Sequence, residues 1–137
     1  MTSSVMGSST VTAATVLVVD DLPDMRMLAR AVLERSGLLV VGEASDGVEA
    51  LERVHALDPP PVPTVILLDN QMPGLTGLEV AAQVLALNPT QLIVMFSAYL
   101  NDDLVAWALE LGVAACVSKG DVSKLAKVIK DLVAARS

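Results

Sequence analysis

Residues 15–37 of this 137-residue chain read TVLVVDDLPDMRMLARAVLERSG. Residues 15–20 form a mostly apolar, β-branched run that ends in Asp20. The run has no polar alternation, which is typical of a strand covered on both faces. Apolar residues then recur at steps of three and four over 25–33, and this spacing predicts an amphipathic helix. Pro23 lies near the helix start and Gly37 just past its end, as such ends prefer. The stretch is one strand followed by one helix.

The same strand–helix unit recurs four more times. Further strands are predicted at 38–43, 64–69, 91–97 and 114–118, and further helices near 48–54, 78–85, 104–111 and 125–132. Alternation of this kind gives right-handed crossovers between parallel strands. Five units of this length suit an open sheet better than a closed barrel. We therefore predict an α/β fold, a (βα)5 doubly wound parallel sheet with the flavodoxin-like strand order 2-1-3-4-5.

Composition limits the classes of function. Nine Lys and Arg oppose 16 Asp and Glu, a formal net charge of −7, which disfavours nucleic acid and anionic membranes as partners. No apolar run approaches the ~18 residues that span a bilayer, and we expect a cytoplasmic protein. Residues 1–14 lack the basic start of a secretory leader and are expected to form a disordered tail before a domain at 15–137.

Polar residues stand where the predicted strands end. They are Asp20, Asp21, Asp69, Ser97 and, just after the last strand, Lys119. In open α/β sheets the ligand site lies outside the carboxyl ends of the strands, and strands one and three are neighbours in the predicted order. Three carboxylates therefore converge and repel one another, which calls for a cation. Oxygen ligands of this kind favour Mg²⁺ over zinc.

This set of groups suits phosphoryl transfer. The reaction needs a nucleophile, neutralisation of the phosphoryl oxygens and in-line positioning. Asp69 stands alone at the end of a central strand and is the best nucleophile candidate, whereas the adjacent Asp20 and Asp21 are better placed to hold metal.

Four segments resemble the motifs of bacterial two-component response-regulator receiver domains. They are Val16–Asp21 (VLVVDD), Val65–Gly74 (VILLDNQMPG), Ile93–Ala98 (IVMFSA) and Val117–Gly120 (VSKG). The resemblance runs from about residue 15 to 135. It implies a phosphoprotein of a phosphorelay, in which Asp69 accepts a phosphoryl group from a histidine kinase or phosphotransfer protein.

The resemblance also implies roles for the surrounding groups. Mg²⁺ would be ligated by Asp21, Asp69 and the backbone carbonyl of Gln71, with Asp20 acting mostly through water. Lys119 would pair with the phosphoryl oxygens. Ser97 would move toward those oxygens once they arrive, and the differential contact would shift the population of the loop after the fourth strand.

Two departures from the family pattern concern the switch. Cys116 stands where the family usually carries an aromatic residue that turns inward on activation, and Gly120 stands where it usually carries proline. We expect Cys116 to be a small buried hydrophobe. Tyr99, two residues after Ser97, is the nearest aromatic alternative, and we expect it at the pocket rim, shielding the aspartyl phosphate from water.

The helix at 104–111 is apolar around most of its circumference and carries Trp107, the only tryptophan. Burial within the monomer would explain this composition, and so would a partner surface. In the family the face formed by this helix, the last strand and the last helix forms homodimers or meets output partners. We expect a dimer or effector contact through Trp107.

Other interpretations compete with the receiver. Asp20 and Asp21 could merely cap the first helix. A small Mg²⁺-dependent phosphohydrolase would also use Asp69 as nucleophile, but such enzymes usually place a second aspartate where this chain has Gln71. A flavodoxin-like ligand-binding module is a third possibility, although no glycine-rich phosphate motif is present. For the receiver we expect no enzymatic turnover beyond slow self-dephosphorylation.

Overall fold

The computed structural model describes residues 14–56 and 63–136. Its sheet contains five parallel strands, all hydrogen-bonded in the order β2-β1-β3-β4-β5. The strands are β1 (Thr15–Val19), β2 (Leu39–Ala44), β3 (Val65–Leu68), β4 (Leu92–Ser97) and β5 (Ala115–Ser118). The predicted fold class and strand order are confirmed.

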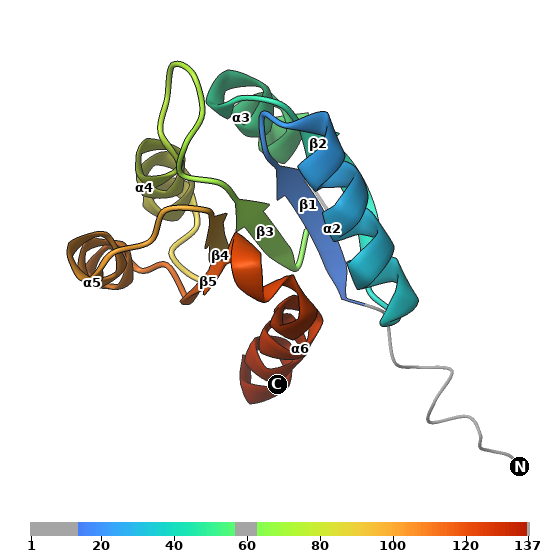
Figure 1. Ribbon diagram of the computed structural model, residues 1–137. Helices are drawn as coiled ribbons and strands as arrows, with labels where there is room; N and C mark the ends of the chain where they lie inside the picture. The colour runs from blue at the N-terminus through green and yellow to red at the C-terminus, as the bar shows by residue number, and fades with distance from the viewer. Residues whose placement is uncertain (1–13, 57–62, 137) are drawn as a thin grey trace, which may run out of the picture.

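Helices cover both faces of the sheet, as Figure 1 shows. They are α2 (Pro23–Arg35), α3 (Gly47–Ala56), α4 (Gly77–Leu87), α5 (Asp102–Leu111) and α6 (Leu125–Arg136). Side chains of α2 and α6 share one core layer with the sheet, and side chains of α3, α4 and α5 share the other. The central strand β3 is buried along its whole length, which explains its uninterrupted apolar sequence.

Several details differ from the sequence predictions. Leu28 and Val48, which fit the apolar spacing of their helices, are 42% and 59% exposed. A 3-10 turn, η1 (Lys119–Lys124), precedes α6 and was not predicted. Residues 1–13 of the predicted tail lie outside the described residues, and Ala14 accepts a backbone hydrogen bond from Leu39 N (3.0 Å). No helix in 14–56 or 63–136 has the length and apolar character needed to cross a bilayer.

Candidate functional site

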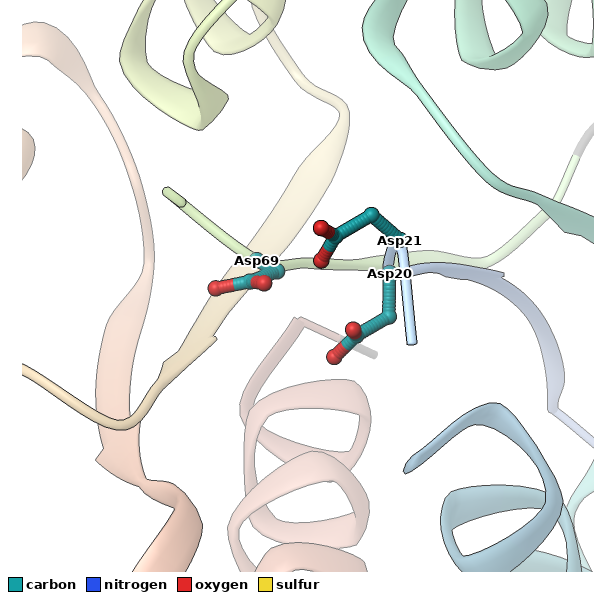
Figure 2. A group of neighbouring side chains, drawn as sticks. All are labelled: Asp20, Asp21 and Asp69. Atoms are coloured by element: carbon teal, nitrogen blue, oxygen red, sulfur yellow. The ribbon is translucent and has the colours of Figure 1, made fainter. Parts of the chain in front are cut away.

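Three carboxylates meet at the carboxyl edge of the sheet (Figure 2). Asp20 and Asp21 directly follow β1, and Asp69 directly follows the neighbouring β3. One oxygen from each lies within 4.8 Å of the others. The parallel register of two adjacent central strands brings these residues together, as their positions at the strand ends predicted. Oxygen donors at this spacing fit a hard divalent cation such as Mg²⁺.

Asp69 is enclosed by the protein and is only 3% exposed. Its Oδ1 accepts a hydrogen bond from the backbone N–H of Gln71 (3.1 Å). Burial raises the pKa of the Asp69 carboxyl above its ordinary range, and the Gln71 hydrogen bond and the Lys119 charge offset only part of that rise. The folded protein therefore holds an anionic oxygen in a place where negative charge is unfavourable.

Lys119 supplies an internal cation to the cluster. Its Nζ lies 2.7 Å from Asp20 Oδ2 and 3.3 Å from Asp69 Oδ2. Burial alone would lower the pKa of Lys119, but the hydrogen bond to Asp20 and the charges of Asp69 and Asp20 outweigh it, so the pKa is raised. From the sequence, we expect a bound cation to relieve the carboxylate repulsion. The structure corrects this, because an ammonium of the chain already neutralises part of the charge.

Asp20 takes part in the turn that leads into α2. Its Oδ1 accepts a hydrogen bond from Leu22 N (2.9 Å), while its other oxygen faces Lys119. The N-cap position of α2 is occupied by Leu22, and no side chain there forms a capping hydrogen bond. Simple helix capping therefore does not account for this aspartate. Asp21 is half-buried and forms no ion pair with any described residue.

Ser97 ends β4 and is fully buried. Its hydroxyl oxygen is the only buried side-chain polar atom without a hydrogen-bond partner in the described parts of the chain. An unpaired buried hydroxyl typically destabilises a protein by about 1–3 kcal/mol. The Ser97 hydroxyl at the carboxyl edge of the sheet is therefore free to hydrogen-bond to a ligand.

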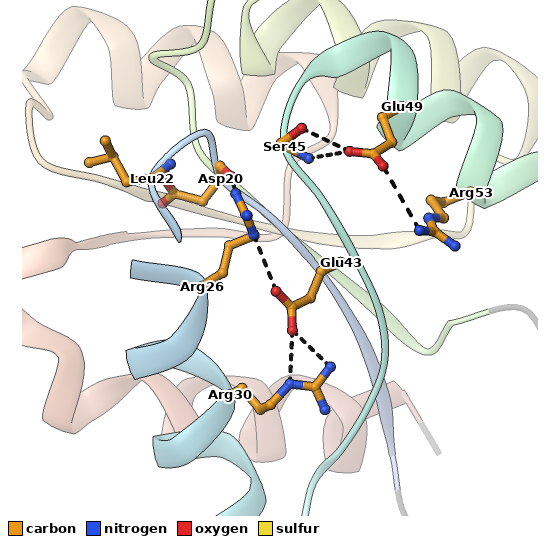
Figure 3. Close-up of polar contacts among 8 residues, drawn as sticks. All are labelled: Asp20, Leu22, Arg26, Arg30, Glu43, Ser45, Glu49 and Arg53. Carbon is orange, nitrogen blue, oxygen red and sulfur yellow. Dashed lines mark hydrogen bonds and ion pairs between the residues drawn. The ribbon is translucent and has the colours of Figure 1, made fainter. Parts of the chain in front are cut away.

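A polar network beside the acidic cluster was missed by the sequence reasoning (Figure 3). Arg26 of α2 donates to the backbone carbonyl of Asp20 (2.6 Å) and to Glu43 of β2 (3.2 Å). Arg30, one turn further on, contacts the other oxygen of Glu43 (2.8 Å). The network ties the turn after β1 to β2. Its sequence signal was two arginines four residues apart on the helix that follows the acidic pair.

Asn70, the residue after Asp69, fixes the loop after β3 to the start of α4. The side-chain oxygen of Asn70 accepts from Leu78 N (3.1 Å), and its backbone carbonyl accepts from Gly77 N (3.2 Å). A Cβ at Gly77 would lie 2.5 Å from the backbone oxygen of Asp69, so only glycine permits this close approach. The position of Asp69 therefore depends on how α4 begins.

Comparison with known proteins assigns the chain to a family. The model of the response regulator receiver domain matches residues 16–130. The chain belongs to this family. Receiver domains are the phosphoacceptor modules of two-component signalling, and the resemblance noted in the sequence is confirmed.

Relatives of this receiver occur alone and within longer proteins. CheY of Thermotoga maritima is 31% identical over 71% of the chain and 78% of CheY. The receiver domain of the putative regulator NarL from Mycobacterium tuberculosis superimposes with a TM-score of 0.81 at 34% identity, covering 89% and 97% of the two chains. A protein-glutamate methylesterase/protein-glutamine glutaminase of Hahella chejuensis is 40% identical over 66% of the chain. The match spans only 25% of that methylesterase.

The other residues predicted to take part are Gln71, Tyr99, Cys116 and Trp107. Gln71 is exposed and its N–H faces Asp69, while its carbonyl as a metal ligand stays a prediction. Tyr99 is 70% exposed. Cys116 is half-buried against the α3–α5 core layer, and burial raises the pKa of its thiol. Trp107 is 66% exposed, so burial within the monomer does not explain why α5 carries this tryptophan on its surface.

Proposed function

We propose that Asp69 is the phosphoacceptor of this receiver and takes its phosphoryl group from a histidine kinase or a phosphotransfer protein. The observation that carries the proposal is the buried Asp69 carboxylate, joined at one edge of the sheet by two further carboxylates and by the Lys119 ammonium. A carboxylate, a cation and oxygen donors are the groups that phosphoryl transfer requires.

In this step an Asp69 carboxylate oxygen attacks the phosphorus of a phosphohistidine. The new P–O bond forms as the P–N bond breaks, and the imidazole leaves with the electron pair and takes up a proton. Lys119 lies beside Asp69 Oδ2 and would neutralise charge on the incoming phosphoryl oxygens. The product is an acyl phosphate on Asp69.

Mg²⁺ would be held by Asp21, Asp69 and the backbone carbonyl of Gln71, with Asp20 nearby acting through water. The convergence of carboxylate oxygens within 4.8 Å supports this assignment. When bound, the ion supplies charge neutralisation to the phosphoryl oxygens. Because Asp20 is already engaged by Leu22 and Lys119, Asp21 is the freer carboxylate for metal.

Ser97 would act as the switch residue. Its buried, unpartnered hydroxyl gains an acceptor when phosphoryl oxygens arrive on Asp69, and this new contact favours one arrangement of the loop after β4. The readout would reach a dimer or an effector through the face formed by α5, β5 and α6. Tyr99, exposed just beyond Ser97, would shield the phosphoryl group from water.

The domain, over residues 15–137, would perform no turnover of its own beyond slow self-dephosphorylation. It would act either as a stand-alone signalling protein or as the regulatory part of a longer regulator. A phosphohydrolase is the alternative, and the side chain of Gln71 speaks against it, because an amide cannot serve as a general acid.

Intact mass after incubation with acetyl phosphate and Mg²⁺ tests the proposal. We expect one added phosphoryl group that hydroxylamine removes, its loss in Asp69→Asn, and its retention in Asp24→Asn, a matched exposed aspartate on α2. Release of inorganic phosphate over many turnovers would identify a phosphohydrolase instead. Labelling that persists in Asp69→Asn would refute the assignment.

A further inference from the structure

A groove of about 510 Å³ lies between α4 and α5 on the outside of the domain. Leu78, Glu79 and Ala82 of α4 form one side, and Leu104, Trp107 and Leu111 of α5 form the other. The lining residues run from Leu78 to Ala82 on α4 and from Leu104 to Leu111 on α5, which at 1.5 Å per residue are lengths of about 6 and about 10 Å. The longer side accommodates about two turns of another helix.

Trp107 faces this groove and not α6. It lines the groove together with Leu104 and Leu111, which lie three and four residues away on the same side of α5. Leu109, two residues on, is rotated by about 200° and so lies on the opposite flank of the helix. The exposed tryptophan therefore belongs to a surface separate from the face formed by α5, β5 and α6.

The rim of the groove is acidic. Glu79 lines it, and Asp103 and Glu110 stand four residues before and three residues after Trp107, where helical neighbours meet. Asp103 and Glu110 are exposed and form no ion pair with any residue in 14–56 or 63–136. The sequence contains no lysine or arginine between Arg53 and Lys119. An apolar floor with an acidic rim that forms no ion pair with a described residue is complementary to a basic, amphipathic ligand.

Neither symmetric pairing of two grooves nor docking of α6 from a second copy suits this surface. Symmetric pairing of two grooves would bring their acidic rims together. The basic helix α6 of a second copy carries Lys127 and Lys130, but its apolar residues Leu125, Ala126 and Ile129 are buried against its own sheet. It therefore has no free apolar face of the kind the groove would bind.

We propose that the α4–α5 groove binds a basic amphipathic helix of a partner protein, with Trp107 as the central anchor and with Asp103, Glu110 and Glu79 contacting lysine or arginine side chains. This is helix-in-groove recognition, in which apolar residues at helical spacing enter the groove. The groove is formed in the unphosphorylated protein, so we expect it to bind the helix without modification of Asp69.

The test uses a fluorescein-labelled amphipathic peptide of leucine and lysine, about four helical turns long. Trp107 is the only tryptophan, so its emission reports on the groove directly. We expect a shift of this emission to shorter wavelength on binding. By peptide anisotropy, Trp107→Ala should weaken binding at least about tenfold. Circular dichroism should show an intact fold, since the side chain is 66% exposed.

Charge variants give the matched control. Glu110→Gln should weaken binding about two- to fivefold. Glu52→Gln removes an exposed acid on α3 that forms no ion pair with a described residue, and should leave binding nearly unchanged. Asp69→Asn should bind as the wild type does, which separates this proposal from the phosphoacceptor assignment.

Three results would overturn the proposal. The first is peptide binding without a change in Trp107 emission. The second is equal weakening by Glu110→Gln and Glu52→Gln, or equal binding of a peptide with glutamate in place of lysine. The third is a concentration-dependent shift of Trp107 emission together with self-association of the protein alone in sedimentation, which would make a second copy the occupant.

Discussion

Lys119 Nζ lies 2.7 Å from Asp20 Oδ2, and both side chains are almost entirely removed from solvent. With Asp69 Oδ2 also 3.3 Å away, one ammonium is shared between two buried carboxylates. The protein therefore carries its own partial neutralisation of the acidic cluster. Under the proposed function, a phosphoryl group on Asp69 would draw Lys119 toward its oxygens and leave Asp20 less well compensated.

Removal of this ammonium should destabilise the metal-free protein. Breaking a buried ion pair leaves an uncompensated charge, so Lys119→Met should lower the free energy of unfolding by about 3 kcal/mol at pH 7. Urea denaturation measures the loss, and added Mg²⁺ should recover more stability in the variant than in the wild type. Lys124→Met is the control, since its side chain is 71% exposed, and should change stability by less than about 0.5 kcal/mol. Equal losses in the two variants would contradict the shared role of Lys119.

The raised pKa of Asp69 predicts a pH-dependent gain in Asp69→Asn. In the unfolded chain this carboxyl loses its proton at its ordinary pKa of about 4, and in the folded protein it does so only at higher pH. Between these values the folded state binds more protons, so the contribution of Asp69 to stability falls as pH rises and stays unfavourable above the folded pKa. Asn carries no such charge.

In chelator, Asp69→Asn should therefore be more stable than the wild type at pH 7.5, and the difference should shrink toward pH 3.5. Urea denaturation at both pH values checks this. Asp24→Asn, at an exposed position in the first turn of α2, should show no gain at pH 7.5. If Asp69→Asn instead loses stability at pH 7.5, the favourable contacts of Asp69 with Lys119 outweigh the unfavourable burial of its charge.

Ser97→Ala should stabilise the unphosphorylated protein, because it removes a buried hydroxyl that has no partner. The expected gain is about 1 kcal/mol in thermal or urea unfolding. The register partner Ser118 provides the control, since its Oγ accepts a hydrogen bond from Gly120 N (3.2 Å) and Ser118→Ala should lose stability. Beryllofluoride with Mg²⁺ should stabilise the wild type more than Ser97→Ala. The reverse order would remove Ser97 from the switch.

Arg26→Lys should weaken Mg²⁺ binding about tenfold, as commonly happens when a group that orients a metal ligand is replaced. Arg26 holds the backbone carbonyl of Asp20 and Glu43 at once, and a single ammonium cannot make both contacts in the same geometry. Arg30→Lys loses contacts with Glu43 but none with Asp20, and should change the affinity much less. Isothermal titration of both variants with Mg²⁺ measures the difference. Similar affinities would show that the turn after β1 is held without Arg26.

The sequence determined the fold and the positions of the principal site residues. Apolar runs and helical spacing are local properties, and five of each in alternation leave few topologies that connect them. Because parallel strands end at one edge, the residues that terminate them converge regardless of side-chain detail. For this reason the sequence alone predicts one site that contains Asp20, Asp21, Asp69, Ser97 and Lys119.

Only the tertiary structure decided how those groups compensate one another. The sequence did not reveal that Lys119 already reaches Asp20, that Arg26 crosses from α2 to the carbonyl behind it, or that Trp107 faces α4. Each of these depends on the rotation of a helix against the sheet and on the reach of a long side chain. Both are set by packing between segments far apart in the chain, and local periodicity carries no information about them.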